Sequence, residues 1–394
     1  MASPALTIYE TTLAQAIYQT LPGQVVTVRP DGLHWLDLHD IECEAFRQEW
    51  RQLATRVADP NPFYEEWYLR PSLRAFDQGG QVRIAALICD GSLRALMPFH
   101  QASAYYGYPV PHTAAWRHAN IFNAVPLIER AYGTQFWAAV LGAFDRDPGG
   151  SLFLHLPAMP QGSEAEQALQ QVVGKDGRPA GIVAREDRAF LQSEIGADDY
   201  YETSLTRKRR KELARLRKRL GEEGALTFHR HHGADRLAEW IDEFVALEAS
   251  GWKGREQSAI GSAPETHALF RDALSGAAQQ GRLERIDLRV DGRPVAMLVN
   301  FLCAPGAFSF KTAFDENYAR YSPGFLLQRE NLQLLDRDDI DWCDSCASEG
   351  HPMIERIWRQ KRTMLGRNVA IGGGIRRRIF ERLLRAEMKK DTPA

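Results

Sequence analysis

The sequence predicts an α+β protein whose sheet is mostly antiparallel and flanked by helices. Between residues 205 and 364 the expected order is helix, helix, helix, strand, strand, strand, helix, strand, helix. Strands joined by short turns are typical of an antiparallel meander, and separate groups of helices around them are typical of the α+β class. The length of 394 residues favours two domains.

The first half mixes strands and helices. Val82–Cys89 and Leu93–Phe99 are apolar runs on either side of Asp90-Gly91, a dipeptide typical of a tight hairpin turn. A short strand is expected over Ser151–Leu156, and the aromatic-rich segment Gly107–Asn123 is expected to be a loop. Periodic apolar positions predict helices over Phe63–Phe76, Phe136–Phe144 and Glu164–Val173.

The second half opens with a helix over Leu205–Gly224, for which Ser204 or Thr203 is an available N-cap. A meander follows through two turns, Asp291-Gly292 and Ala304-Pro305-Gly306, and its strands are Leu283–Val290, Pro294–Cys303 and Ala307–Phe314. A short strand is expected over Asp339–Cys343. The remaining helices are Asp235–Ser250, Pro264–Gln280, Phe325–Leu335, His351–Met364 and Arg377–Lys390.

Composition limits the class of protein. The 49 basic and 51 acidic residues give a net charge of -2, which argues against a chain that binds nucleic acid or anionic membranes with its whole surface. The sequence contains no run of 18 apolar residues, so a membrane span is not expected. Met1–Gly23 lacks the basic head and apolar core of a secretory signal. The five cysteines, an odd number, argue against a disulfide framework, so a cytoplasmic location is expected.

Leu247–Arg255 ends a helix in a Trp-Lys pair flanked by Gly251 and Gly254. The glycines permit a tight backbone turn that lets Trp252 and Lys253 reach into a cleft. The alternative is a helix C-terminus that carries an exposed lysine.

The segment Phe308–Asp315 alternates strictly, so Lys311 is expected to face away from Phe308 and Phe310. Burying the charges of Lys311 and Asp315, at the two ends of a core strand, costs free energy unless the two side chains are paired or face a cleft. A buried ion pair and a substrate-binding role are therefore both open. Ser322-Pro323-Gly324 offers backbone N–H groups at a helix start, which is a potential anion site.

Residues Arg207–Arg219 hold nine positive charges and one negative charge in thirteen residues. Either this is a solvated helix face, or it docks a phosphate-rich partner such as tRNA, a nucleotide-linked acceptor, an acyl carrier protein or CoA. No aromatic residues for base stacking interrupt the run, which argues against sequence-specific RNA binding.

Redox and metal chemistry are not expected. Cys343 and Cys346 have redox spacing but no second cysteine pair for zinc. His229, His231 and His232 lie on an expected strand, face both ways, and have no nearby cysteine or carboxylate in the sequence to complete a metal set.

A set of motifs over about residues 200–365 resembles the CelD/BcsL-like branch of the GNAT acyltransferases. The motifs, in the order of that branch, are Leu247–Arg255, Gly292–Ala296, Lys311–Asp315, Ser322–Gly324 and Asp344–Ala347 with Trp358. The branch is similar to the Fem-type peptidoglycan aminoacyltransferases, which carry two GNAT-like domains. The resemblance therefore implies a degenerate GNAT-like domain over 1–200 and a GNAT acyltransferase domain over 201–394, with a basic helix at 204–222.

The resemblance also implies a donor site. The strands Pro294–Cys303 and Ala307–Phe314 are expected to part and hold the thioester of acetyl-CoA or another acyl-CoA, without a metal. Gly324 is the only glycine of the expected phosphate loop, a departure from the usual pattern, so an acyl carrier protein or a charged tRNA stays open as donor. The expected donor-phosphate residues are Arg320, Ser322, Gly324 and Phe325.

The implied chemistry is the attack of an amine on a thioester carbonyl, which needs a base and a donor for the oxyanion. Glu248 and Asp315 are the candidate bases. Lys311 joins them in the catalytic set, and with Lys253 it is expected to bind an anionic acceptor or a donor phosphate. Asp344 is expected to orient the amine, and the substrate-binding set is Trp252, Lys253, Asp344 and Trp358.

The leading functional hypothesis is acyl transfer from acyl-CoA to an amine of a sugar, an amino acid or a polysaccharide or cell-envelope precursor. Two alternatives stay open. The basic helix favours ligation that depends on an aminoacyl-tRNA, and a non-catalytic binding protein of an exopolysaccharide system is the third possibility.

Overall fold

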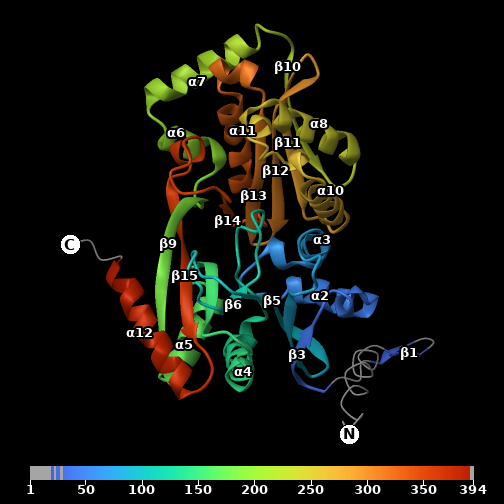
Figure 1. The fold of residues 1–394 in the computed structure, drawn as a ribbon. Helices are drawn as coiled ribbons and strands as arrows, with labels where there is room; N and C mark the ends of the chain where they lie inside the picture. Colours follow the sequence, from blue (N-terminus) through green and yellow to red (C-terminus); the bar gives the residue numbers. More distant parts are fainter. Residues whose placement is uncertain (1–18, 22–23, 27–29, 391–394) are drawn as a thin grey trace. The chain divides into compact units, whose positions relative to one another are not determined.

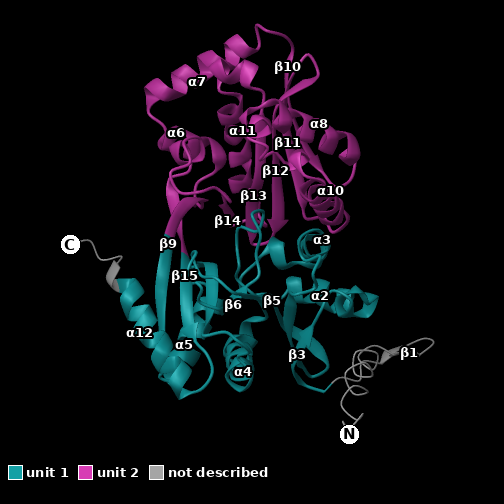
Figure 2. Ribbon diagram, viewed as in Figure 1, with its two compact units in different colours: residues 1–185, 365–394 teal, residues 186–364 magenta. Residues whose placement is uncertain are grey.

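The structure is a computed structural model that describes residues 19–21, 24–26 and 30–390 (Figure 1). Two compact units are present: unit 1 comprises residues 1–185 and 365–394, and unit 2 comprises residues 186–364 (Figure 2). These bounds differ from the expected division after residue 200, because the last thirty residues pack with the first unit. The segment 1–18, which carries most of the expectation about a secretory signal, lies outside the described residues.

The cysteines and the helices bear on two general expectations. All five cysteines are free thiols, so the chain has no disulfide framework. Within the described ranges, no helix combines the length and the apolar character that crossing a membrane requires.

Unit 1 contains a sheet in the order β15-β8-β6-β5-β4-β3, with β7 paired to β5. Its strands are β3 (Gly32–Leu36), β4 (Arg83–Cys89), β5 (Ser92–Ala102), β6 (His112–Ala115), β7 (Leu127–Ile128), β8 (Phe153–Pro160) and the second part of β15 (Gln360–Ala370), beside a short pair of β1 (Gln19–Leu21) and β2 (Gln24–Val26). Its helices are α2 (Glu44–Ala54), α3 (Glu66–Phe76), α4 (Gly133–Arg146), α5 (Glu164–Lys175) and α12 (Gly374–Lys390).

Unit 2 contains a sheet in the order β10-β11-β12-β13-β14-β9. Its strands are β10 (Leu226–His232), β11 (Leu283–Val290), β12 (Arg293–Cys303), β13 (Gly306–Phe314), β14 (Trp342–Asp344) and the second part of β9 (Ala180–Leu191). Its helices are α6 (Ala197–Ser204), α7 (Arg207–Leu220), α8 (Leu237–Ser250), α9 (Trp252–Arg255), α10 (Pro264–Gln279) and α11 (Pro323–Asn331).

Both predicted Asp-Gly hairpins are present. Asp90 and Gly91 have φ values of 52° and 68°, and Asp291 and Gly292 have values of 48° and 76°. Positive φ at both central residues is the geometry of a type I′ turn, whose twist matches that of the flanking strands. The antiparallel pairs β4–β5 and β11–β12 follow from these turns.

Helices cover both faces of the sheet in unit 2. On one face, the rings of Phe244 in α8 and Phe270 in α10 lie 5.1 Å apart, and Phe270 continues the stack to Phe310 and Phe301 on β13 and β12. On the other face, α11 and the end of α7 pack on aliphatic residues of β11 and β12, in a cluster that contains Leu220, Ile286, Leu288, Ala296, Leu298, Leu326 and Leu327. Alternation along the strands separates the two sets, so the faces are called below the α8 face and the α11 face.

Several expected elements are wrong in type or bounds. The expected helix His351–Met364 is a short 3-10 turn, Ile354–Arg356, followed by β15, because Gln360 onward pairs in a sheet. The loop expected over Gly107–Asn123 contains β6. The N-cap of α7 is Thr206, whose hydroxyl accepts from Arg209 N at 3.3 Å, since Thr203 and Ser204 belong to α6.

Candidate functional site

The strands that part are β13 and β14, which run parallel. Their register joins Gly306, Ala307 and Phe308 to Trp342, Cys343 and Asp344, and there β14 ends while β13 continues to Phe314. The expected parting between β12 and β13 is wrong, because those strands pair antiparallel from Ala296↔Phe314 to Cys303↔Gly306. The ladder therefore ends between β13 and β14, one strand further along the sheet than expected, and the place where it ends is called below the opening.

A β-bulge interrupts β13 opposite β12. The register passes from Val299↔Lys311 to Asn300↔Ser309, which leaves Phe310 as the extra residue. Phe308 opposes Phe301 and Lys311 opposes Val299, so both lie on the α8 face. The expected opposite facing of Lys311 and Phe308 is wrong for this reason. The Lys311 ammonium lies 5.6 Å from the centre of the Phe310 ring.

Glu248, near the end of α8, holds the chain that follows the helix. Its side chain is 4% exposed. One oxygen, Oε1, accepts from Lys253 Nζ at 2.7 Å, and Oε2 accepts from the backbone N–H of Ile260 at 2.7 Å. Both oxygens of this candidate base therefore have internal donors.

The glycine-flanked turn is required by a close backbone approach. A Cβ on Gly254 would lie 1.9 Å from the carbonyl oxygen of Ala249. The backbone N–H of Trp252 donates to Glu316 at 2.7 Å, which ties the turn to the loop after β13. The Trp252 ring itself is 48% exposed. The expected tight turn is confirmed, and it directs Lys253 toward Glu248.

Lys311 has an altered ionisation. Burial lowers its pKa to about 8, with a smaller contribution from the positive charge of Lys253, while Glu248 and Cys346 act in the opposite direction. Burial and the same Lys253 charge lower the pKa of His351. Lys253 thus acts on both groups, and we define the site cluster as Glu248, Lys253, Lys311, Cys346 and His351.

Asp344 ends β14 inside the protein. It is fully buried, and Oδ2 pairs with Arg188 at 2.7 Å and with Arg362 at 3.4 Å. Oδ1 accepts from the backbone N–H of Cys346 at 2.9 Å, where the chain adopts a φ of 52°. These donors favour a role in holding the chain at the opening rather than direct contact with an amine.

The loop between β13 and α11 contains the other expected site residues. Asp315 caps a 3-10 turn by accepting from Asn317 N at 2.9 Å. Ser322 has a left-handed backbone with a φ of 54° at the start of α11. A Cβ on Gly324 would lie 2.7 Å from Met353 Sδ, so Met353 fills the space that a side chain at this position would need. Arg320 is exposed and pairs with Glu223 at 3.1 Å.

Two expected contact residues lie in the interior. Trp358 is 0% exposed in a core cluster with Ile357, Leu213 and Leu216. Phe325 is 4% exposed in the same cluster, with the Arg209 guanidinium 5.4 Å from its ring centre. Burial of this kind favours a packing role for both side chains.

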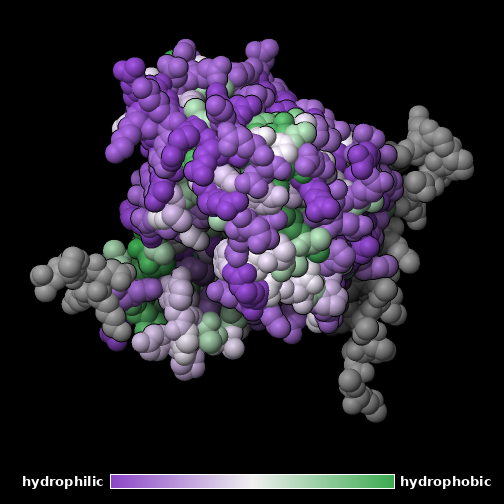
Figure 3. Space-filling model, turned by 90° about the horizontal axis from the view of Figure 1, so that it is seen from above, coloured by the Kyte–Doolittle hydropathy of each residue, from purple (hydrophilic) through white to green (hydrophobic). Residues whose placement is uncertain are grey.

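The basic helix α7 borders a cavity of about 550 Å³. Residues spaced at helical intervals on α7 line it, together with α6 and α11, and the basic members are Arg207, Arg210, Lys211, Arg217 and Arg329. Two of them have acidic partners: Glu202 lies 3.4 Å from Arg210, and Asp198 lies 4.0 Å from Arg329. The end of unit 2 that includes α7 is predominantly hydrophilic when seen from above (Figure 3). One face of α7 thus lines a positively charged cavity.

The structure adds residues that the sequence reasoning missed. These residues are Arg188, the buried partner of Asp344, and His351 of the site cluster. Asp287 on β11 lies directly opposite His229. The histidines therefore have a nearby carboxylate in space, although none is near them in the sequence. Sequence distance hid both relations, because 156 and 58 residues separate the partners.

Comparisons with known proteins agree with this architecture. Residues 207–351 match the family model described as an acetyltransferase (GNAT) domain. No curated protein sequence matches the chain. The chain is similar to the crystal structure of FemX, at 10% identity and a TM-score of 0.55, over 82% of this chain and 96% of that chain. It is also similar to a conserved protein of unknown function from Bacteroides thetaiotaomicron VPI-5482, at 11% identity and a TM-score of 0.53, over 86% and 100% of the two chains.

At these identities the structural likeness shows the fold alone. The fold is GNAT-like, a mixed sheet flanked by helices, and the predicted fold class is confirmed. Assignment to the CelD/BcsL-like branch stays a prediction.

Proposed function

We propose that the chain is a GNAT-type N-acyltransferase whose reaction takes place where β13 and β14 part. The observation that carries the proposal is the three-residue register of these parallel strands, which ends beside the site cluster. A β13 backbone that continues past its partner offers peptide groups for an extended ligand, as an exposed strand edge does for an added strand. The match of residues 207–351 to a GNAT acetyltransferase domain supports this reading.

The proposed donor is acetyl-CoA or another acyl-CoA. Its thioester arm would lie along β13 beyond Phe308, and its phosphates would lie at Ser322 and Gly324, where α11 begins. The start of α11 carries partial positive charge, which suits a pyrophosphate. The backbone donor there is the N–H of Gly324, because Pro323 has no N–H and the N–H groups of Phe325 and Leu326 donate to Ser322 O. Arg320 is the exposed cation of that loop. A donor phosphate would replace Glu223 as its partner.

The proposed reaction is direct attack by an acceptor amine. The nitrogen forms a bond to the thioester carbonyl carbon, the C–S bond breaks, and the CoA thiolate leaves and takes up a proton. With a pKa of about 8, Lys311 is partly a neutral amine near neutral pH, so it can accept the proton that the acceptor loses. Glu248 is proposed to position Lys253, and Asp315 stays the alternative base.

The proposed acceptor is an amine on a sugar, an amino acid or a cell-envelope precursor, as the CelD/BcsL-like resemblance implies. Lys253 and His351 are the proposed partners of an anionic group of such an acceptor, which would relieve the repulsion that Lys253 exerts on a protonated His351. The half-exposed Trp252 ring, on the same turn, offers a flat apolar surface to a sugar or an acyl chain.

A thiol-release assay tests the proposal. The full chain is incubated with a panel of acyl-CoAs and amine acceptors, and free CoA is quantified while native mass spectrometry records which acyl-CoA binds. Lys311→Met is expected to lower kcat by about 100-fold or more, as expected for loss of a proton acceptor. Lys175→Met, an exposed lysine of unit 1, is the matched control and is expected to leave the rate unchanged. Failure of every acyl-CoA to bind or react would overturn the proposal.

A second candidate function is favoured by the cavity beside α7. Five basic side chains against two acidic ones fit a phosphate-rich donor such as an aminoacyl-tRNA. Anisotropy of labelled tRNA at 50 and 200 mM salt tests it. The double variant Arg207→Glu/Lys211→Glu is expected to abolish a salt-dependent affinity, whereas Arg215→Glu/Lys218→Glu, outside the cavity lining, is expected to weaken it less. Equal losses of tRNA affinity in the two double variants would indicate a solvated face only. If neither acyl-CoA nor tRNA binds, a non-catalytic binding protein is favoured.

A further inference from the structure

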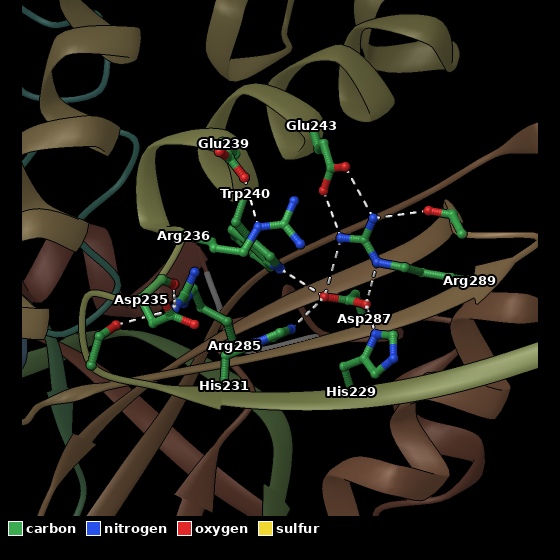
Figure 4. Close-up of polar contacts among 12 residues, drawn as sticks. His229, His231, Asp235, Arg236, Glu239, Trp240, Glu243, Arg285, Asp287 and Arg289 are labelled. Atoms are coloured by element: carbon green, nitrogen blue, oxygen red, sulfur yellow. Dashed lines mark hydrogen bonds and ion pairs between the residues drawn. The ribbon is translucent and has the colours of Figure 1, made fainter.

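His229, His231 and Asp287 form a cluster of potential metal ligands on the α8 face. His229 and His231 are two residues apart on β10, so their side chains share one face, and Asp287 on β11 is paired directly with His229. His229 Nδ1 lies 3.1 Å from Asp287 Oδ1, and His231 Nε2 lies 2.9 Å from Asp287 Oδ2. Figure 4 shows both imidazoles directed at the same carboxylate.

These separations are close to those of a coordination shell. In a tetrahedral zinc site with bonds of about 2.0–2.1 Å, neighbouring ligand atoms lie about 3.3 Å apart. The ligand atoms of the three residues all lie within 4.8 Å of one another. The side chains of the two imidazoles are 44% and 30% exposed, so neither is fixed by packing on all sides.

The carboxylate is already oriented by donors that are not metal ligands. Arg289 Nε donates to Oδ1 at 2.7 Å, and Trp240 Nε1 donates to Oδ2 at 3.1 Å (Figure 4). The Arg289 guanidinium is held from its far side by both oxygens of Glu243, at 3.0 and 2.6 Å. Outer-shell hydrogen bonds of this kind fix a ligating carboxylate in the geometry that a metal needs.

The local charge permits a cation. Three carboxylates, Asp235, Glu243 and Asp287, stand against the two guanidiniums of Arg285 and Arg289, so the cluster has an excess of negative charge when the histidines are neutral. Arg285 is turned away from Asp287, because its Nη2 donates to the carbonyl oxygens of Gly233 and Asp235. Arg285 nevertheless lies opposite His231 in the strand register and acts electrostatically on Asp287, so a dication would meet the charge of both guanidiniums, with Arg289 the one in direct contact with the carboxylate.

We propose that His229, His231 and Asp287 bind one divalent transition-metal ion of the zinc class, with water from the exposed side completing the coordination. Two imidazoles and one carboxylate are a donor set for zinc, cobalt, nickel or copper rather than for magnesium or calcium. The site is separate from the proposed acyl-transfer site: Trp240 is eight residues before Glu248 on α8, a rise of about 12 Å along the helix. Binding would fasten the edge strand β10 to β11.

The alternative is a hydrogen-bonded cluster without a metal. The two imidazole N–H groups and Trp240 supply one donor each and Arg289 supplies two, which together occupy the roughly four acceptor positions of an ionised carboxylate. In the metal-bound state the protons of the two imidazoles would lie on the other ring nitrogens, so no net proton release is needed. The two states are distinguished by binding of the metal itself.

Titration of the full chain with Co²⁺, after chelator treatment and without an added histidine tag, provides the test. Visible absorption bands of four-coordinate cobalt report inner-sphere nitrogen and oxygen ligands, and equilibrium dialysis with Zn²⁺ gives the stoichiometry. We expect one ion per chain, the cobalt bands, and a rise in Tm on addition of Zn²⁺. His229→Ala and His231→Ala should each lower the affinity by more than the roughly 10–100-fold that loss of an outer-shell partner costs.

His232→Ala is the matched control, because His232 lies on the opposite face of the same strand and should leave affinity and Tm shift unchanged. The two test histidines are partly exposed, so their variants are expected to fold, whereas Asp287→Asn also loosens Arg289 and Trp240. Absence of stoichiometric uptake would overturn the proposal. So would unchanged affinity in His229→Ala and His231→Ala, or loss of uptake in Cys43→Ser, which would assign the ion to a thiol.

Discussion

At the scale of single residues, Lys311 connects the sheet to the proposed chemistry. Its pKa of about 8 lies below that of a lysine in an unfolded chain, about 10.4. Between these values the unfolded state binds more protons than the folded state, so folding stability rises with pH. Below pH 8 both states are protonated, and the cost of burying the ammonium is present in full.

Lys311→Met is therefore expected to stabilise the chain at pH 7 by on the order of 3 kcal/mol, an advantage that fades as the pH approaches 10. Urea unfolding at pH 7, 8.5 and 10 measures this. Lys175→Met, on the exposed surface of α5, is the control and should follow the wild-type curve at all three values. Parallel curves for wild type and Lys311→Met would contradict the assigned ionisation.

Gly254 is a residue at which the shape of the backbone determines the site. Alanine there would place a Cβ 1.9 Å from the Ala249 carbonyl oxygen, and the contacting atom is backbone that cannot rotate away. We expect Gly254→Ala to lower the free energy of unfolding by about 2 kcal/mol or more. Gly174→Ala in α5, where nothing lies within 4 Å, should be neutral or stabilising by up to about 1 kcal/mol. Equal unfolding midpoints for the two variants would contradict the contact.

At the scale of elements, local signals predicted the meander and its turns. Asp-Gly dipeptides between apolar runs determine hairpins through positive φ, and both hairpins are present. The bulge at Phe310 was beyond such reasoning, because an extra residue in a strand leaves the alternation of residue types intact while it changes which face each side chain meets. The error over His351–Met364 has a related cause: β15 is defined by neighbours distant in the sequence.

The candidate site was predictable in residue type and only partly in arrangement. The motif Leu247–Arg255 led to Glu248 and Lys253, and the structure pairs them at 2.7 Å. The role of Asp344 could not be read from its own motif, because its partner Arg188 comes from β9. Pairings across strands depend on sheet order, which the sequence pattern of one strand does not contain.

The Asp344–Arg188 pair holds β14 between its neighbours. β14 has three residues, with β13 on one side and β9 on the other, so few ladder bonds fix it. Asp344→Asn keeps an acceptor for Cys346 N and removes the charge that compensates the buried Arg188. Breaking a buried pair in this way should cost about 3 kcal/mol in the free energy of unfolding.

The double variant Asp344→Asn/Arg188→Met should recover part of that loss, because it removes the uncompensated charge as well. A double-mutant cycle from urea unfolding measures the coupling. Additive losses would show that the two side chains do not stabilise each other. Recovery would place the energetic role of Asp344 in the scaffold of the opening rather than in contact with substrate.

At the scale of the whole molecule, the chain leaves unit 1 and returns to it. Residues 186–364 form one unit, and residues 365–394 complete the other. The sequence predicts two consecutive halves, because linear composition carries no mark of a segment that returns. Unit 1 depends on the returning segment: the Phe380 ring lies 5.3 Å from Phe153, and Arg377 pairs with Asp145 at 2.8 Å.

Removal of residues 374–394, which deletes α12, should therefore loosen unit 1 and spare unit 2. Burial of Phe380 and Leu384 alone corresponds to on the order of 4 kcal/mol. Hydrogen exchange measured by mass spectrometry is expected to show lost protection in α4 and β8 and retained protection in β11–β13. Arg378→Ala, at an exposed position of α12, is the control and should change neither unit. If the deletion instead loosens β11–β13 and leaves β8 protected, the division after residue 200 describes the folding units better than the division given by packing.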